Sequence, residues 1–151
     1  MRPKRLQYSY RDDPQVPVFA DDKPLIVFDG VCVLCSGFAR FVVNHDPGGR
    51  FRLTTAQSPL GQALYRHFDL DPLDFETNLL IADGRASTKL DAFAGIMDRL
   101  GGRWRLAKLA RNMPRPVGNW LYDRIALNRY RLFGRTGTCM VPPSDWAERV
   151  L

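Results

Sequence analysis

Two cysteines three residues apart are the side chains of this sequence best suited to chemistry. Cys32 and Cys35 follow an apolar run at 25–28 and precede a segment with helical spacing of apolar residues. On a first helical turn, residues i and i+3 share a face, within the Cα separation of roughly 4.4–6.8 Å that a disulfide tolerates. The positive end of the helix dipole favours a thiolate there. The spacing predicts dithiol–disulfide exchange, in which Cys32, nearer the helix end and solvent, attacks and Cys35 resolves the mixed disulfide.

Other uses of a cysteine pair fit the sequence less well. A structural zinc site needs four ligands, usually as two close pairs, and Cys139, His45 and His67 do not form a second pair. Covalent haem attachment requires His directly after the second cysteine, where this sequence has Ser36. Two buried structural cysteines remain an alternative, since free cysteines are often buried. We favour redox chemistry and expect no metal.

Several segments resemble the DCC family of thiol–disulfide oxidoreductases, which is named for an Asp-x-x-Cys-x-x-Cys pattern. The first is FDGVCVLC at 28–35, and the others are the second strand with its Gln-Ser at 51–58, the segment 122–131, Phe133-Gly134 and Cys139. The resemblance spans about residues 24–151. It implies a thioredoxin-like fold and dithiol chemistry, but no particular substrate.

The pattern of apolar residues and turn signals predicts an α/β fold of that kind. Strands alternate or are continuously apolar, and helices carry an apolar stripe. Ser58-Pro59 suits a helix start, and Asp83-Gly84 suits a hairpin turn. The expected elements are strands at 25–29, 50–56, 78–82 and 85–89, with helices at 35–45, from 58, and at 90–100. This βαβαββα order is the thioredoxin topology with a mixed central sheet.

The same signals divide the chain into three parts. Residues 1–24 combine prolines with charges, which favours an extended or disordered arm. Residues 25–102 form the thioredoxin-like core. Residues 103–151 are expected to be a basic helical extension and tail packed on that core, with Pro114 and Pro116 separating a short helix from a longer one.

Two further positions are candidates for the site. Asp29 ends the first strand, where a buried carboxylate could accept or return a proton during exchange. Asp-Gly also suits a turn, and a carboxylate opposes a nearby thiolate, so we favour turn formation or capping. Thioredoxins place a cis-proline just before the third strand, facing the disulfide. The residue before Asn78 is instead Thr77, which we take as a candidate for substrate binding.

Basic residues concentrate near the C-terminal end. Between Arg99 and Arg135 only Asp123 is acidic, whereas ten residues are cationic: Arg99, Arg103, Arg105, Lys108, Arg111, Arg115, Arg124, Arg129, Arg131 and Arg135. Such a cluster could bind nucleic acid or an anionic membrane surface. No helix-turn-helix or aromatic RNA-binding signature accompanies it. We favour a solvated helix face whose aromatic residues pack on the sheet.

Composition and the N-terminus limit location and cofactors. The chain has 151 residues, a formal net charge of +6 and three cysteines, which is the size of one domain. No apolar run approaches the roughly 18 residues of a membrane span, and no apolar region of a secretory signal follows the basic residues 1–5. We therefore expect a cytoplasmic protein. No flavin or nicotinamide motif is visible, so no cofactor is expected.

The leading hypothesis is a thiol–disulfide oxidoreductase acting on a disulfide-containing protein or a low-molecular-weight thiol, with electrons supplied by another thiol system. The alternative is a non-enzymatic, redox-responsive module that binds an anionic partner through its basic C-terminal region. A structural scaffold with inert cysteines is a third possibility. We expect Cys139 to be a packing residue, because the two-cysteine pair already completes an exchange cycle.

Overall fold

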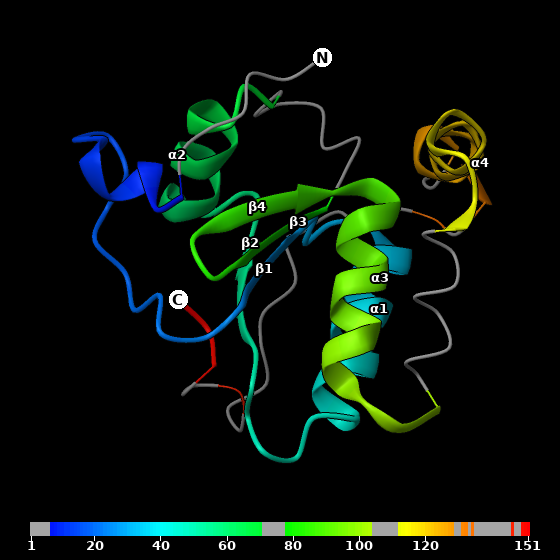
Figure 1. Cartoon of the computed structure of the whole chain (residues 1–151), viewed down its shortest axis with the longest axis horizontal. Helices are drawn as coiled ribbons and strands as arrows, with labels where there is room; N and C mark the ends of the chain where they lie inside the picture. The colour runs from blue at the N-terminus through cyan, green and yellow to red at the C-terminus, as the bar shows by residue number, and fades with distance from the viewer. Residues whose placement is uncertain are drawn as a thin grey trace.

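The computed structural model describes residues 7–70, 78–103, 112–128, 131–132, 134, 146 and 149–151. They form a central sheet with helices on both faces (Figure 1). The elements are η1 (Ser9–Asp12), β1 (Leu25–Phe28), α1 (Val33–Asn44), β2 (Arg52–Thr55), α2 (Pro59–His67), β3 (Leu79–Ala82), β4 (Arg85–Thr88), α3 (Lys89–Leu100) and α4 (Arg115–Leu127).

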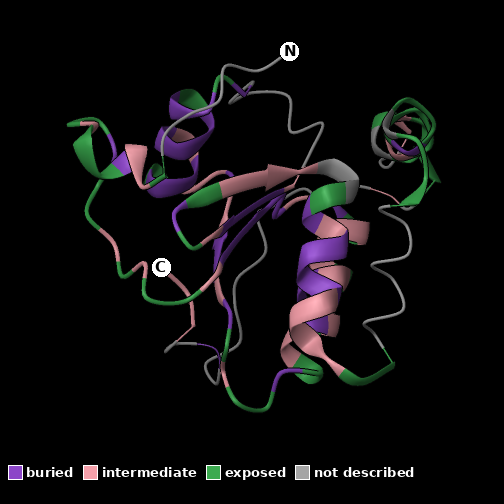
Figure 2. Cartoon of the chain, in the orientation of Figure 1, coloured by how far each residue is buried: buried purple, intermediate pink, exposed green. Residues whose placement is uncertain are grey.

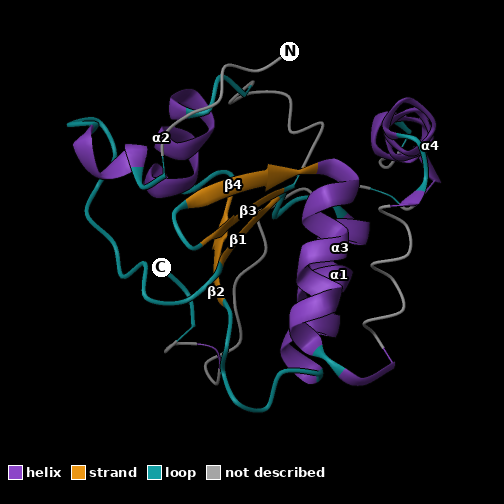
Figure 3. Ribbon diagram, in the orientation of Figure 1, coloured by secondary structure: helices purple, strands orange, loops and turns teal. Residues whose placement is uncertain are grey.

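The sheet has the strand order and directions of a thioredoxin-like fold. Its order is β2-β1-β3-β4, with β1 and β2 parallel and β3 antiparallel to both β1 and β4. The crossover from β1 to β2 carries α1, as a parallel pair requires. Figure 3 shows this succession of strands and helices. The expected thioredoxin-like α/β fold is confirmed.

Alternation along the strands divides the hydrophobic core into two halves. Leu25 and Val27 point to the face covered by α2. Ile26 and Phe28 point to the opposite face, where α1 and α3 pack. Because both faces of β1 are covered, all four of its residues are buried, as Figure 2 shows for the sheet centre. Burial on two faces explains why this strand reads as an unbroken apolar run.

Element boundaries agree with the sequence pattern within a few residues and differ most at two helix starts. The hairpin turn is confirmed, since Asp83 and Gly84 have φ values of 53° and 74°, as a type I′ turn requires. Helix α1 begins at Val33 rather than 35, which makes Cys32 its N-cap. The sequence predicts that the longer C-terminal helix begins near Val117 or Gly118, after Pro116. Helix α4 instead begins at Arg115, with Pro116 in its first turn, where a missing amide hydrogen costs little.

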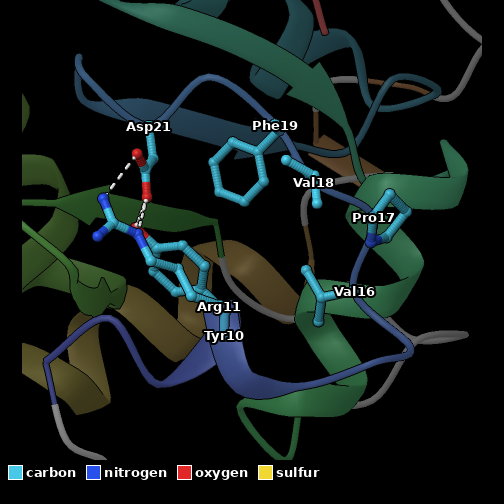
Figure 4. Close-up of a pocket in the computed structure, with 7 residues that line it drawn as sticks. All are labelled: Tyr10, Arg11, Val16, Pro17, Val18, Phe19 and Asp21. Carbon is cyan, nitrogen blue, oxygen red and sulfur yellow. Dashed lines mark hydrogen bonds and ion pairs between the residues drawn. The ribbon is translucent and has the colours of Figure 1, made fainter.

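The N-terminal segment from residue 7 onward differs from the expected extended or disordered arm. Tyr10 is 2% exposed and joins the α2 side of the core with Val16. Asp21 accepts hydrogen bonds from the Tyr10 hydroxyl at 2.9 Å and from Arg11 at 2.8 and 3.0 Å. These groups border a cavity of about 290 Å³ (Figure 4). The local composition of the N-terminal segment does not reveal this packing. The division of the chain into three parts remains a prediction.

The C-terminal residues extend the sheet beside β2. Leu53 donates its amide hydrogen to Arg149 at 2.7 Å and accepts one from Leu151 at 2.9 Å. Arg149 also binds the buried carboxylate of Asp46 at 3.0 Å. Trp146 is buried between these contacts and the α1 side of the core. The end of the chain is therefore part of the folded core.

Replacing Asp21 tests the role of the N-terminal segment. The hydrogen bond from Arg11 lowers the pKa of Asp21 below its usual value of 3.8. A lowered folded-state pKa stabilises the fold fully above about pH 5, and that contribution is lost as the pH falls through the folded-state pKa. We expect Asp21→Asn to reduce the free energy of unfolding in urea by a constant amount from about pH 7 to 5, and the difference from wild type to shrink below about pH 4.

Asp22→Asn is the matched control for this measurement. The carboxylate of Asp22 is 63% exposed and lies 3.5 Å from Arg52, so its removal should change stability less. A destabilisation by Asp21→Asn that is the same at all pH values would show that the ion pair is not its cause.

Candidate active site

Cys32 caps the N-terminus of α1 with its sulfur. Its backbone is extended, with φ −81° and ψ 122°, and its Sγ accepts a hydrogen bond from the Cys35 amide at 3.3 Å. This is the position where a serine or aspartate oxygen usually binds the N3 amide. A hydrogen bond to the sulfur and the positive end of the helix dipole both favour the thiolate. The geometry at the start of α1 therefore supports ionisation of Cys32.

The expectation that Cys32 lies nearer to solvent is wrong. Cys32 is 0% exposed, whereas Cys35 is partly exposed. A distant segment also meets the helix start, because the Val33 amide donates a hydrogen bond to the Gly134 carbonyl at 3.3 Å. A contact a hundred residues away along the chain cannot be seen in the local Cys-x-x-Cys pattern. As the attacking thiol, Cys32 is favoured by the groups that stabilise its thiolate, and Cys35 is favoured by its greater exposure to solvent.

The loop that leads from β1 to the cysteines is held by Gln57. The Gln57 side chain donates to Asp29 Oδ1 at 2.7 Å and accepts from the Gly30 amide at 3.0 Å. Asp29 Oδ1 also accepts from the Val31 amide at 3.1 Å, and the Asp29 carbonyl accepts from the Cys32 amide at 3.3 Å. Hydrogen bonds therefore hold both the backbone of this loop and the Asp29 side chain in place just before α1 begins.

Comparison with known proteins agrees with this geometry. The family model for DCC1-like thiol-disulfide oxidoreductases matches residues 26–135, which include the cysteine pair and most of the chain. The chain belongs to this family. It is 38% identical over 127 residues to an uncharacterized protein of Bacillus subtilis (strain 168) named YuxK, covering 84% of this chain and 93% of that protein.

A second relative comes from a plant. The DCC1-like chain is 34% identical over 120 residues to a chloroplastic DCC family protein of Arabidopsis thaliana, covering 79% of this chain and 70% of the relative. No solved structure matches the chain. The resemblance that the sequence motifs indicated is therefore confirmed at the level of the family.

In this DCC1-like chain, Asp29 makes the contacts of a turn residue. Its side chain is buried, with the residue 3% exposed, and its Oδ1 binds the amide two residues ahead, as in an Asx turn. These contacts support turn formation, which the sequence favours. A role for Asp29 in proton transfer stays a prediction.

Gln57 is a residue beside the cysteine pair that the sequence analysis did not single out. It follows β2, whose last residue Thr55 pairs with Phe28 of the parallel strand β1. Parallel neighbours end at the same edge of a sheet, which places Gln57 beside Asp29. Its sequence signal is the Gln-Ser pair after the second strand, at the end of the segment 51–58 that resembles the family.

Two other candidate positions, Thr77 and Cys139, lie outside the described residues, and their roles remain predictions. The neighbouring Asn78 is described and links α4 to the start of β3. Its amide donates to the Tyr122 hydroxyl at 3.3 Å, and that hydroxyl donates to Asn78 Oδ1 at 2.8 Å.

No helix in the described part of the chain is long and apolar enough to cross a membrane.

Removing the Gln57 side chain should loosen the loop before the cysteines. Gln57→Ala deletes two hydrogen bonds and leaves the buried Asp29 carboxylate with fewer donors, which should cost about 1–3 kcal/mol of unfolding free energy. We also expect the thiols of the pair to react several-fold more slowly with a small aromatic disulfide, because the helix start is less well fixed. Stopped-flow absorbance of the released thiolate measures this rate.

Gln62→Ala is the matched control. Gln62 likewise bonds to the backbone after β2, donating to the Ala56 carbonyl at 2.8 Å, but it belongs to α2, which packs on the face of the sheet opposite α1. It should lower stability by about 1 kcal/mol and leave the thiol reaction rate unchanged. Equal rates in both variants would show that Gln57 serves only stability.

Proposed function

We propose that this DCC1-like protein catalyses thiol–disulfide exchange with Cys32 and Cys35, and that it acts as a disulfide reductase supplied with electrons by another thiol system. The observation that carries the proposal is the hydrogen bond from the Cys35 amide to the Cys32 sulfur at the start of α1. It places the Cys32 sulfur at a helix N-terminus, where a thiolate is favoured, with a second thiol one turn away. Membership of the family supports the same chemistry.

The exchange cycle uses the two sulfurs in turn. The Cys32 thiolate attacks one sulfur of a substrate disulfide, forming a mixed disulfide and releasing the other sulfur as a thiolate. Cys35, after losing its proton to solvent or to the departing thiolate, attacks Cys32 Sγ. This second step forms the Cys32–Cys35 disulfide and releases the reduced substrate. Two electrons have moved to the substrate, and two external thiols restore the pair as they are oxidised to a disulfide.

We assign the first attack to Cys32 despite its burial. Only a thiolate is an effective nucleophile, and the helix N-terminus and the Cys35 amide both stabilise charge on the Cys32 sulfur. The greater exposure of Cys35 would favour the reverse order. Substituting each cysteine separately distinguishes the two assignments.

Cys35→Ser should retain the attacking thiolate but lose the resolving thiol. Mixed disulfides with substrates should then accumulate and be released by dithiothreitol, while Cys32→Ser should trap nothing. Non-reducing gel electrophoresis followed by mass spectrometry of the trapped adducts measures the result. Circular dichroism of both variants verifies that the fold is intact.

Trapping by Cys32→Ser and not by Cys35→Ser would reverse the two roles. Absence of trapping in both variants, together with no disulfide reduction by the wild type, would contradict the proposed function and favour a structural pair.

The identity of the substrate and the location of the protein are proposed separately. We expect either a protein disulfide or a low-molecular-weight disulfide as substrate, in keeping with the chemistry of the pair. A cytoplasmic location remains a prediction. The alternative function, redox-responsive binding of an anionic partner, predicts salt-sensitive retention on nucleic acid without disulfide turnover.

A further inference from the structure

Helix α4 exposes an unusual number of large apolar side chains. Trp120 is 57% exposed, and Figure 2 shows the helix largely in the colour of exposed residues. The other members of this face recur at helical spacing, and we call the set the α4 face: Val117, Trp120, Leu121, Ile125 and Leu127, each 43–62% exposed. The expectation that the aromatic residues of this region pack on the sheet is wrong for Trp120. An exposed apolar cluster of this kind marks an interaction surface.

Cationic side chains accompany the apolar ones. The Arg124 guanidinium lies 5.0 Å from the centre of the Trp120 ring, within the range of a cation–π contact. Arg124 and Arg131 are both exposed. The α4 face therefore complements a partner surface that offers apolar side chains together with carboxylates.

Two contacts place helix α4 at the end of the sheet that carries the cysteines. Tyr122 binds Asn78, and Asn78 precedes Leu79, which pairs with Val27 near the end of β1. Figure 1 shows α4 beyond the end of the sheet at which α3 begins.

The second contact follows the end of α4. The Leu132 amide donates to the Asn128 carbonyl at 2.8 Å, and two residues later Gly134 accepts from the Val33 amide. Leu132 and Val33 are themselves 63% and 44% exposed. Apolar surface is therefore found on α4, just after it and between the two cysteines.

We propose that the α4 face is the docking surface for a disulfide-bonded polypeptide whose disulfide is flanked by apolar and acidic residues. This inference rests on the proposed function and selects a polypeptide over a small thiol. The exposed apolar side chains lie along a helix of 13 residues, about 20 Å in length, and match the side chains of a polypeptide better than a small, polar disulfide. The place of α4 at the end of the sheet that carries the cysteine pair favours a substrate over a membrane surface or a second copy of the chain.

Two peptides with the same internal disulfide test the proposal, one flanked by leucine and glutamate and the other by serine and lysine. Wild type should reduce the first with a kcat/KM roughly tenfold higher. Trp120→Ala should abolish most of this preference by raising KM. Reduction of a small aromatic disulfide should be unchanged, because Trp120 is an exposed side chain of α4 and the cysteines lie at the start of α1.

Val117→Asp and Val18→Asp form a matched pair of substitutions. Both valines are exposed, at 52% and 103%, but Val18 lies in the N-terminal segment. An acid at position 117 suits the first turn of α4, so this variant should fold and yet repel the acidic peptide. Val117→Asp should lose the preference, and Val18→Asp should keep it.

Binding of the same peptides with both cysteines replaced by serine, measured by fluorescence anisotropy, separates docking from chemistry. Weaker binding to Val117→Asp than to wild type supports the docking surface even if no disulfide is reduced, in which case only the proposed function fails. Equal binding and equal kcat/KM for both peptides would overturn the docking proposal.

The same variants decide between the other occupants. Self-association in light scattering that Val117→Asp abolishes, without any peptide preference, would assign the α4 face to a second copy. Sedimentation with phosphatidylserine vesicles, lost in Val117→Asp and again without peptide preference, would assign it to a membrane. Either result would overturn the proposal.

Discussion

The hydrogen bond from the Cys35 amide to the Cys32 sulfur is the interaction around which this structure is arranged. This bond forms only because α1 begins at Val33, directly after Cys32. The position of that helix start is set by the end of β1, which lies in the centre of the sheet with β2 on one side and β3 on the other. Because β1 is buried on both faces, its end is a rigid base for the helix start. A surface strand would leave the same two cysteines in a much looser arrangement.

The rigidity continues into the loop through a neighbouring strand. Gln57 can reach Asp29 and Gly30 because β1 and β2 are parallel and in register at Phe28 and Thr55. The start of α2 then fixes the path of the chain after Gln57. A Cβ atom at Gly61 would lie 2.2 Å from the Thr55 carbonyl oxygen, so only glycine allows this close approach. The geometry of the cysteine pair therefore depends on residues that carry no redox chemistry.

Features encoded by neighbouring residues could be predicted from the sequence, and features made by distant contacts could not. Ser58 caps α2 by binding the Gly61 amide, and Asp83-Gly84 forms its turn, because the relevant atoms lie within a few residues. The packing of Tyr10 needs the core beneath α2, and the role of Gln57 needs the pairing of β1 with β2. The burial of Cys32 similarly escaped the local pattern, which reports only that a helix begins nearby.

Burial and reactivity of Cys32 place opposite demands on the same sulfur. An apolar environment disfavours a thiolate, and only hydrogen bonds and the helix dipole can offset that cost. The cap geometry supplies both, so a buried Cys32 is compatible with an ionised one. Exchange still requires a substrate sulfur to reach it, and one of the contacts at the start of α1 is the hydrogen bond from the Val33 amide to the Gly134 carbonyl. Because Gly134 lies just beyond α4, a partner bound to that helix would act on the segment that meets the start of α1, which gives substrate docking and access to Cys32 a common physical basis.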